Sequence, residues 1–129
     1  MLFFPDFFFF FIEELLNSAE YIFSKGNEKL LLCERGIRTF ETIYRNTFDI
    51  NAIQILKDKS HLPVISDPSH GIGIREYVPK LALASLMTGA DGIIYEVHEK
   101  PEEAVSDGQQ TVNFIESEKL VKKIELLKA

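Results

Sequence analysis

Polar side chains follow three short apolar runs of the sequence, at the point where each run ends. The segment ERG follows the first run, DPSH follows the second, and YEVH closes the third. Histidine and carboxylate side chains are ligands of divalent metals of borderline hardness. The set His70, Glu96 and Asp107, the last from the segment SDG, could therefore bind a divalent metal.

Each of these three residues also has an ordinary structural explanation. His70 could be a hydrogen-bonded loop residue, and Glu96 could be a surface acid at the end of a strand. Asp107 could be a turn residue or a helix N-cap. The hypothesis of a site depends on the three residues occurring together at successive strand ends.

Four arginines lie near the same strand ends in a chain of net charge −6. They are Arg35, Arg38, Arg45 and Arg75. Guanidinium groups bind phosphate and carboxylate in a bidentate manner. The arginines thus favour an anionic ligand, although one or two of them could simply pair with surface acids.

Helices and short buried strands are predicted to alternate along the chain. Helices are expected over residues 12–25, 51–57, 75–88 and 110–128, and strands over residues 29–33, 62–66 and 92–97. Strands that are apolar on both faces and alternate with helices are typical of an α/β fold with a parallel sheet. The carboxyl ends of such strands share one edge, where ligand sites form. This edge would bring the polar segments together.

Composition narrows the class of protein. The 129 residues are 46% hydrophobic and 26% charged, which suits one ordinary domain. The acidic net charge argues against a nucleic-acid partner. Cys33 is the single cysteine of the sequence, so no internal disulfide can form and a cytoplasmic location is expected. No apolar run approaches the length of a membrane span, so no membrane partner is expected.

The segment 1–11 has an atypical composition, with seven phenylalanines. It carries neither the basic region nor the small-residue cleavage site of a signal peptide. We interpret it as an apolar lead-in to the first helix, in strand or helical form. A membrane or export role is the alternative.

Three longer segments carry a family resemblance. CERGIRTFETIYRNTFDI (33–50), LPVISDPSHGIGIREYVP (62–79) and GADGIIYEVHEKPEEAVSDG (89–108) resemble the C-terminal half of 3-deoxy-D-arabino-heptulosonate 7-phosphate (DAHP) synthase, which opens the shikimate pathway of aromatic amino-acid biosynthesis. The resemblance extends over residues 12–128. The related 3-deoxy-D-manno-octulosonate 8-phosphate synthase is the alternative, but the elements RTFE and RNT favour the heptulosonate enzyme.

The resemblance implies a fold, a reaction and a ligand set. Members of the family are (β/α)₈ barrels that condense phosphoenolpyruvate with erythrose 4-phosphate, using a divalent metal such as Mn²⁺. The metal-ligand positions of the family that match this sequence are His70, Glu96 and Asp107. Arg35 matches a phosphoenolpyruvate-binding arginine, and His70 and Arg35 are the expected catalytic residues. The expected substrate-binding set is Arg35, Arg45, Asn46, Thr47, Ser69, His70 and Arg75.

The sequence also departs from the family. A (β/α)₈ barrel needs about 250 residues, so this chain is expected to form an incomplete barrel as one partial domain over residues 1–129. The family's metal-binding cysteine has no counterpart here, because Cys33 matches a residue that is not a ligand. We therefore expect a truncated synthase-like chain that is inactive alone. A non-catalytic half-barrel that serves as an association module is the other interpretation.

An incomplete barrel should also associate, either with itself or with a complementing N-terminal half. Its open strand edges and its inner face have no partner within the chain. The apolar residues expected to make that face are Leu30, Leu32, Val64, Ile65, Ile93 and Ile94.

Overall fold

A computed structural model describes residues 11–128 of the chain. The phenylalanine-rich segment lies outside the described residues except for Phe11, so the expectation for it is untested. The α-helices are α1 (Ile12–Ser24), α2 (Ile50–Lys59), α3 (Pro68–Ile72), α4 (Val78–Met87) and α5 (Phe114–Lys128). The strands are β1 (Leu32–Glu34), β2 (Val64–Ser66) and β3 (Gly92–Ile93), and two 3₁₀ turns are η1 (Arg75–Tyr77) and η2 (Pro101–Glu103).

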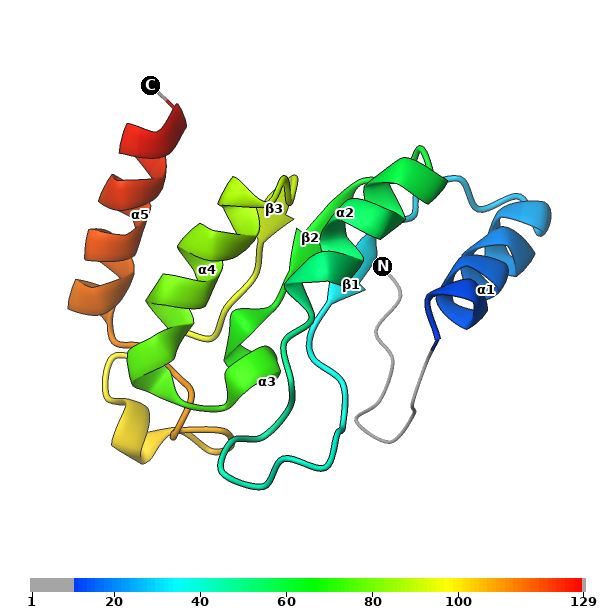
Figure 1. Ribbon diagram of the computed structural model, residues 1–129. Coiled ribbons are helices and arrows are strands. Elements are labelled where there is room, and N and C mark those ends of the chain that lie inside the picture. Colours follow the sequence, from blue (N-terminus) through cyan, green and yellow to red (C-terminus); the bar gives the residue numbers. More distant parts are fainter. Residues whose placement is uncertain (1–10, 129) are drawn as a thin grey trace.

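The three strands form one parallel sheet in the order β1-β2-β3. The α/β fold with a parallel sheet is therefore confirmed. Figure 1 shows α1, α2, α4 and α5 standing in sequence order from right to left across the molecule. The loop after β1, the short helix α3 and the loop before α5 gather at the lower side of that view, which is the carboxyl edge of the sheet.

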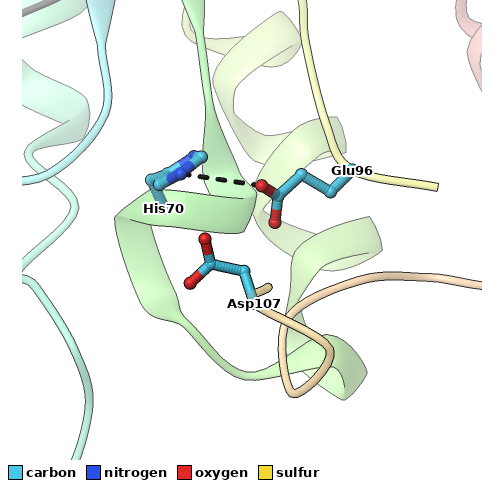
Figure 2. A group of neighbouring side chains, drawn as sticks. All are labelled: His70, Glu96 and Asp107. Atoms are coloured by element: carbon cyan, nitrogen blue, oxygen red, sulfur yellow. Dashed lines mark ion pairs between the residues drawn. The ribbon is translucent and has the colours of Figure 1, made fainter. Parts of the chain in front are cut away.

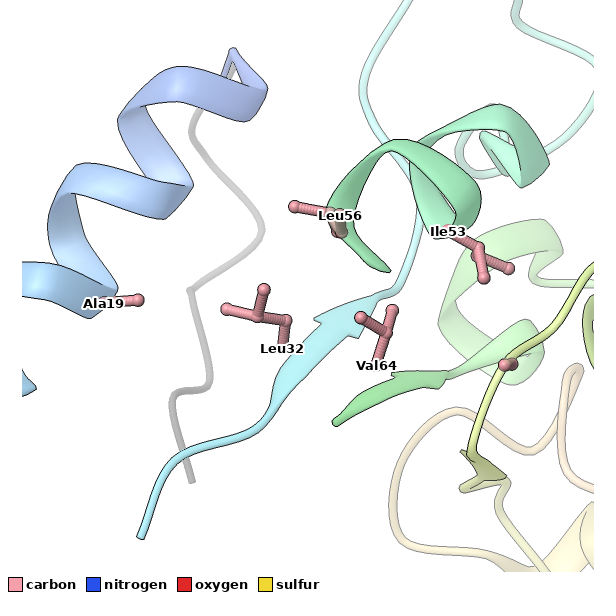
Figure 3. Packing of buried hydrophobic residues seen from close by; sticks show 6 residues of the cluster. Ala19, Leu32, Ile53, Leu56 and Val64 are labelled. Atoms are coloured by element: carbon pink, nitrogen blue, oxygen red, sulfur yellow. The ribbon is translucent and has the colours of Figure 1, made fainter. Parts of the chain in front are cut away.

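The main hydrophobic core lies between the sheet and the first two long helices. Leu32 of β1 and Val64 of β2 are paired in register and contribute to one buried cluster. Ile53 and Leu56 enter this cluster from α2, and Ala19 enters it from α1 (Figure 3). Helix α2 contributes because its apolar positions recur at helical spacing. The core fixes β1 and β2, and with them the start of the loops at their carboxyl ends.

The apolar residues of the three predicted strands do not share one face, and this corrects the expectation for an open apolar surface. Leu30, Leu32 and Val64 are buried, whereas Ile65, Ile93 and Ile94 are half-buried. Successive side chains of a strand point to opposite faces, so one half of the expected set packs into the helix-covered core. Cys33 and Ile65 are paired in register on the opposite face of β1 and β2.

Local signals explain where the helices begin. The Asp49 side chain accepts a hydrogen bond from the backbone of Asn51 and caps α2. The predicted helix 75–88 is divided, because η1 precedes α4 and Pro79 occupies the first turn of α4. The predicted helix 110–128 begins later, at Phe114.

The third predicted strand is shorter than expected. Residues 92–97 were expected to pair throughout, but β3 ends at Ile93. Beyond that point β2 has already turned into α3, and Val97 instead forms a parallel bridge with Val112. This bridge brings the loop before α5 to the carboxyl edge of the sheet.

No helix within residues 11–128 has the length and apolar character that a membrane crossing requires.

Candidate functional site

His70, Glu96 and Asp107 converge at the carboxyl edge of the sheet. One potential ligand atom from each lies within 4.8 Å of the other two. His70 Nε2 is 3.7 Å from Glu96 Oε1. Figure 2 shows the three side chains approaching one another from α3, from the segment after β3 and from the loop before α5. The three segments are far apart in sequence, so the fold alone creates this group.

Asp67 orients the ring of His70. Its Oδ2 lies 2.8 Å from His70 Nδ1, and its Oδ1 accepts a hydrogen bond from the His70 backbone N–H. Asp67 is the N-cap of α3, and Pro68 follows it in the first turn. A carboxylate that binds one ring nitrogen of a histidine leaves the other nitrogen for a metal. The ring of His70 is thus held with Nε2 toward Glu96.

Both carboxylates of the group also have partners that hold them. Gln110 Nε2 donates to Glu96 Oε2 at 2.8 Å, so Oε1 is the oxygen on the side of His70. Arg45 Nη1 donates to Asp107 Oδ1 at 2.7 Å. Asp107 itself has a φ of 53°, in the left-handed region that aspartate tolerates better than most residues. Each potential ligand is therefore braced by a neighbouring side chain.

This donor set fits a divalent metal of borderline hardness. The group offers one imidazole nitrogen and two carboxylate oxygens as ligands. Each of the three side chains also has a polar atom that is hydrogen-bonded to a neighbouring side chain, as the ligands of metal sites commonly have. Cys33 is not part of the group among the described residues. Burial raises the pKa of its thiol to about 12, so it stays protonated at neutral pH.

The expected anion-binding residues surround the same edge. Arg35 Nε lies 3.7 Å from Asp67 Oδ2, with its side chain about one fifth exposed (19%). Arg75 Nε donates to Glu116 Oε2 at 2.7 Å, which ties η1, just before α4, to the start of α5. Arg45 and Arg75 thus each pair with an acid, while Arg38 donates to the carbonyl of Arg45.

Asn46, Thr47 and Ser69 make hydrogen bonds that shape the site. Asn46 donates its side-chain amide to the carbonyl of His70, and the Thr47 hydroxyl shares a hydrogen bond with Thr39. The Ser69 hydroxyl accepts from the backbone N–H of Glu96 and is fully buried. These contacts join the loop after β1, α3 and the segment after β3. Contact of these three residues with a substrate remains a prediction.

Buried Glu34 holds the loop that carries several of these residues. Its Oε1 accepts hydrogen bonds from the backbone N–H groups of Gly36 and Asp49, at the two ends of the loop. Burial raises the pKa of its carboxyl to about 7, even though these hydrogen bonds favour the charged form.

The roles of Asp67, Glu34 and Gln110 are not among those predicted from the sequence. The Asp67 role could have been recognised, because an aspartate before proline and three residues before histidine is an N-cap signal. Nothing in the segment around Gln110 marks it. Its side chain is buried beside Glu96, next to the bridge between Val97 and Val112.

A parallel sheet with helices and with polar groups at its carboxyl edge defines an α/β protein whose candidate ligand site lies at that edge. The model of the DAHP synthetase I family matches residues 6–128 of the chain. The chain therefore belongs to the DAHP synthetase I family.

Named relatives and solved structures agree with this membership. A phospho-2-dehydro-3-deoxyheptonate aldolase of Thermotoga maritima is 53% identical over 116 residues, covering 90% of this chain and 34% of the relative. The crystal structure of the Thermotoga maritima DAHP synthase superposes with a TM-score of 0.89 at 52% identity, covering 91% of this chain and 34% of that one. A 2-dehydro-3-deoxyphosphooctonate aldolase of Geobacter sulfurreducens is 35% identical over 128 residues, covering 90% of this chain and 46% of the relative.

The chain is thus much shorter than these relatives. It spans about a third of the Thermotoga protein and less than half of the Geobacter protein. The resemblance to the DAHP synthase family predicted from the sequence is confirmed.

Proposed function

We propose that this chain forms the C-terminal part of a (β/α)₈ barrel in a DAHP synthase-like enzyme, a transferase of the shikimate pathway. The reaction would be the aldol-type condensation of phosphoenolpyruvate with erythrose 4-phosphate. The observation that carries the proposal is the convergence of His70, Glu96 and Asp107 in a chain 53% identical to a named heptonate aldolase.

In this proposal the arginines and the α3 turn hold the two anionic substrates. Arg35 binds phosphoenolpyruvate, and Arg75 with the turn Ser69–His70 lies where the aldose phosphate binds. Arg45, Asn46 and Thr47 line the same edge. Holding two reactants in one geometry turns a bimolecular encounter into a positioned one, and guanidinium groups offset the charge that two phosphorylated substrates bring together.

His70, Glu96 and Asp107 would hold a divalent metal such as Mn²⁺. When bound, such an ion polarises a carbonyl oxygen. The contribution of the chain is orientation, because Asp67 fixes the ring of His70 and Gln110 fixes the carboxylate of Glu96. Three protein ligands leave further positions of the ion open.

We further propose that the 129-residue chain is inactive by itself. Its single cysteine is protonated and lies outside the ligand group, so the thiolate ligand implied by the family resemblance is not supplied by this chain. A complementing N-terminal half or a second copy would be its partner. The single cysteine also supports a cytoplasmic location.

An assay for condensation tests the proposal. The purified chain is incubated with both substrates and Mn²⁺, alone and with the N-terminal part of the Thermotoga relative, and formation of the heptulosonate phosphate is measured. We expect no product from the chain alone, because removing even one well-placed electrostatic group costs about 10²–10³ in rate. We expect product with the added part, and none when the chain carries His70→Ala. Product from the chain alone would contradict the expected inactivity.

The octulosonate reaction is the second candidate, favoured by the 35% identity to the Geobacter relative. An octulosonate has one carbon more than a heptulosonate, so its aldose phosphate would have five carbons. Replacing erythrose 4-phosphate with a five-carbon aldose phosphate in the same assay distinguishes the two. Binding of the added part without product from either aldose would instead support a non-catalytic association module.

A further inference from the structure

Gln110 is a buried amide between two charged partners at the candidate metal group. Its side chain is fully buried. Its Oε1 accepts from Arg45 Nη1 at 2.9 Å, and its Nε2 donates to Glu96 Oε2 at 2.8 Å. An amide has an acceptor end and a donor end, so a cation on one side and a carboxylate on the other fix its orientation.

The same arginine reaches the other carboxylate of the group. Arg45 Nη1 lies 2.7 Å from Asp107 Oδ1 as well as 2.9 Å from Gln110 Oε1. The hydrogen bonds therefore run without interruption from Asp107 through Arg45 and Gln110 to Glu96. We call these four side chains the brace.

The brace determines which carboxylate oxygens face His70. Since Gln110 holds Glu96 Oε2, the oxygen near the ring of His70 is Oε1, 3.7 Å from Nε2. Arg45 similarly holds Asp107 Oδ1. Partners of this kind orient metal ligands, and their loss lowers metal affinity by about 10–100-fold.

We propose that Gln110 is a positioning residue for divalent-metal binding, which sets the geometry of Glu96 and, through Arg45, couples Glu96 to Asp107. The inference rests on the proposed metal site. It differs from that proposal in assigning the spacing of the two carboxylates to a residue that is not a ligand. Arg45, expected from the sequence to bind substrate, here acts first on the metal-binding side chains.

Titration of the full chain with Mn²⁺, followed by electron paramagnetic resonance of the free and the bound ion, tests the inference. We expect Gln110→Met to weaken binding by about 10–100-fold and to change the spectrum of the bound ion, because Glu96 loses its orientation. Gln109→Met is the matched control, since Gln109 is the exposed neighbour, and it should bind as the parent does. Equal affinity and equal spectra for the Gln110 and Gln109 variants would overturn the inference while leaving the metal site intact.

His70→Ala separates this result from failure of the site itself. If the parent binds Mn²⁺ no better than His70→Ala, both the site and the inference are overturned. Should Gln110→Met not fold, as judged by circular dichroism, Gln110→Asn keeps the amide but is one methylene shorter, so it cannot bridge Arg45 and Glu96 as Gln110 does. It should show the same loss of affinity, and parent-like affinity would overturn the inference.

Where the Met variants fold, Arg45→Met combined with Gln110→Met should weaken binding by less than the product of the two single effects, because both act through one brace. If the double variant loses affinity by the full product of the two single effects, the coupling of Glu96 to Asp107 through the brace is overturned.

Discussion

At the scale of single residues, the fold changes the chemistry of Glu34. The residue is buried, with 7% of its surface exposed, and it is the last residue of β1. The two backbone N–H groups that it holds stabilise the charged form, but burial has the larger effect and raises the pKa from 4.5 to about 7. The folded protein therefore binds a proton here that the unfolded chain has released at pH 6.

Glu34 should make the free energy of unfolding depend on pH. Because the pKa of this acid is raised on folding, its proton stabilises the folded state below about pH 4.5, and this contribution is lost as the pH rises to about 7. The full change is on the order of 3 kcal/mol. A glutamine at this position cannot ionise. The Glu34→Gln variant should therefore be more stable than the parent at pH 8, and its free energy of unfolding should fall much less between pH 4.5 and pH 8.

Urea unfolding between pH 4.5 and pH 8 measures the effect of Glu34. The control is Glu125→Gln on α5, because Glu125 is exposed, and it should follow the parent at every pH. If the free energy of unfolding depends on pH in the same way for the parent and for Glu34→Gln, then Glu34 does not change its proton affinity on folding.

The candidate site could be predicted in part at this scale. His70, Glu96 and Asp107 stand in segments whose residue types point to metal chemistry, and the order of strands predicts that they meet. Gln110 could not be found in the same way, because its role depends on a hydrogen bond to Glu96 that forms only when the loop before α5 lies against the sheet. The type of a residue can indicate that it is a ligand, but it does not indicate which neighbouring side chain orients that ligand.

At the scale of elements, the loop after β1 packs against α3 through two glycines. A Cβ on Gly36 would lie 2.6 Å from Asn46 Cβ and 3.0 Å from the Cα of Gly71. The Gly36 φ is +88°, in the left-handed region that favours glycine. The close approach lets Asn46 reach the carbonyl of His70.

Gly36→Ala should therefore destabilise the protein more than its backbone angle alone explains. Gly26 offers a matched control, because its φ is also +88° and a Cβ there would meet nothing within 4 Å. We expect Gly26→Ala to cost about 1–2 kcal/mol from the left-handed conformation, and Gly36→Ala to cost about 1–3 kcal/mol more from overpacking. Urea unfolding of both variants measures the difference, and equal losses would refute the close approach.

Element positions followed from the sequence more closely than element ends did. The apolar periodicity and the glycine stops located α1, α2, α4 and the strands. The end of β3 could not be predicted, because it is set by the neighbour β2 turning into α3 and not by the residues of the run GIIYEV. The prediction that Leu32 and Val64 lie on an open face was wrong for a related reason. When a strand is apolar on both faces, its sequence does not indicate which face the helices cover.

At the scale of the whole molecule, the sheet remains open within the described residues. The outer edge of β1 pairs with no other strand there, and the face that carries Cys33 and Ile65 is half-buried. Unpaired strand edges promote association. We expect the protein to form a homodimer or a larger species, with the phenylalanine-rich segment at or near the contact.

Light scattering on freshly purified protein measures the assembly. Deletion of residues 1–10 or the substitution Ile65→Lys should shift the population toward the monomer. The exposed residue Ile55 on α2 provides the control Ile55→Lys, which should leave the assembly unchanged. A stable, monodisperse monomer of the parent chain at tens of micromolar would refute the expectation.

The short helix α3 has a consequence for the order in which the site could assemble. Asp67 and His70 are three residues apart, so their hydrogen bond closes a loop of one helical turn. Arg45 and Asp107 are 62 residues apart, and joining them requires the ordering of most of the chain between them. The orientation of the imidazole is thus encoded locally, while the spacing of the carboxylates is encoded by topology. During folding, or in a partly unfolded chain, the histidine can take its final direction before either carboxylate reaches it.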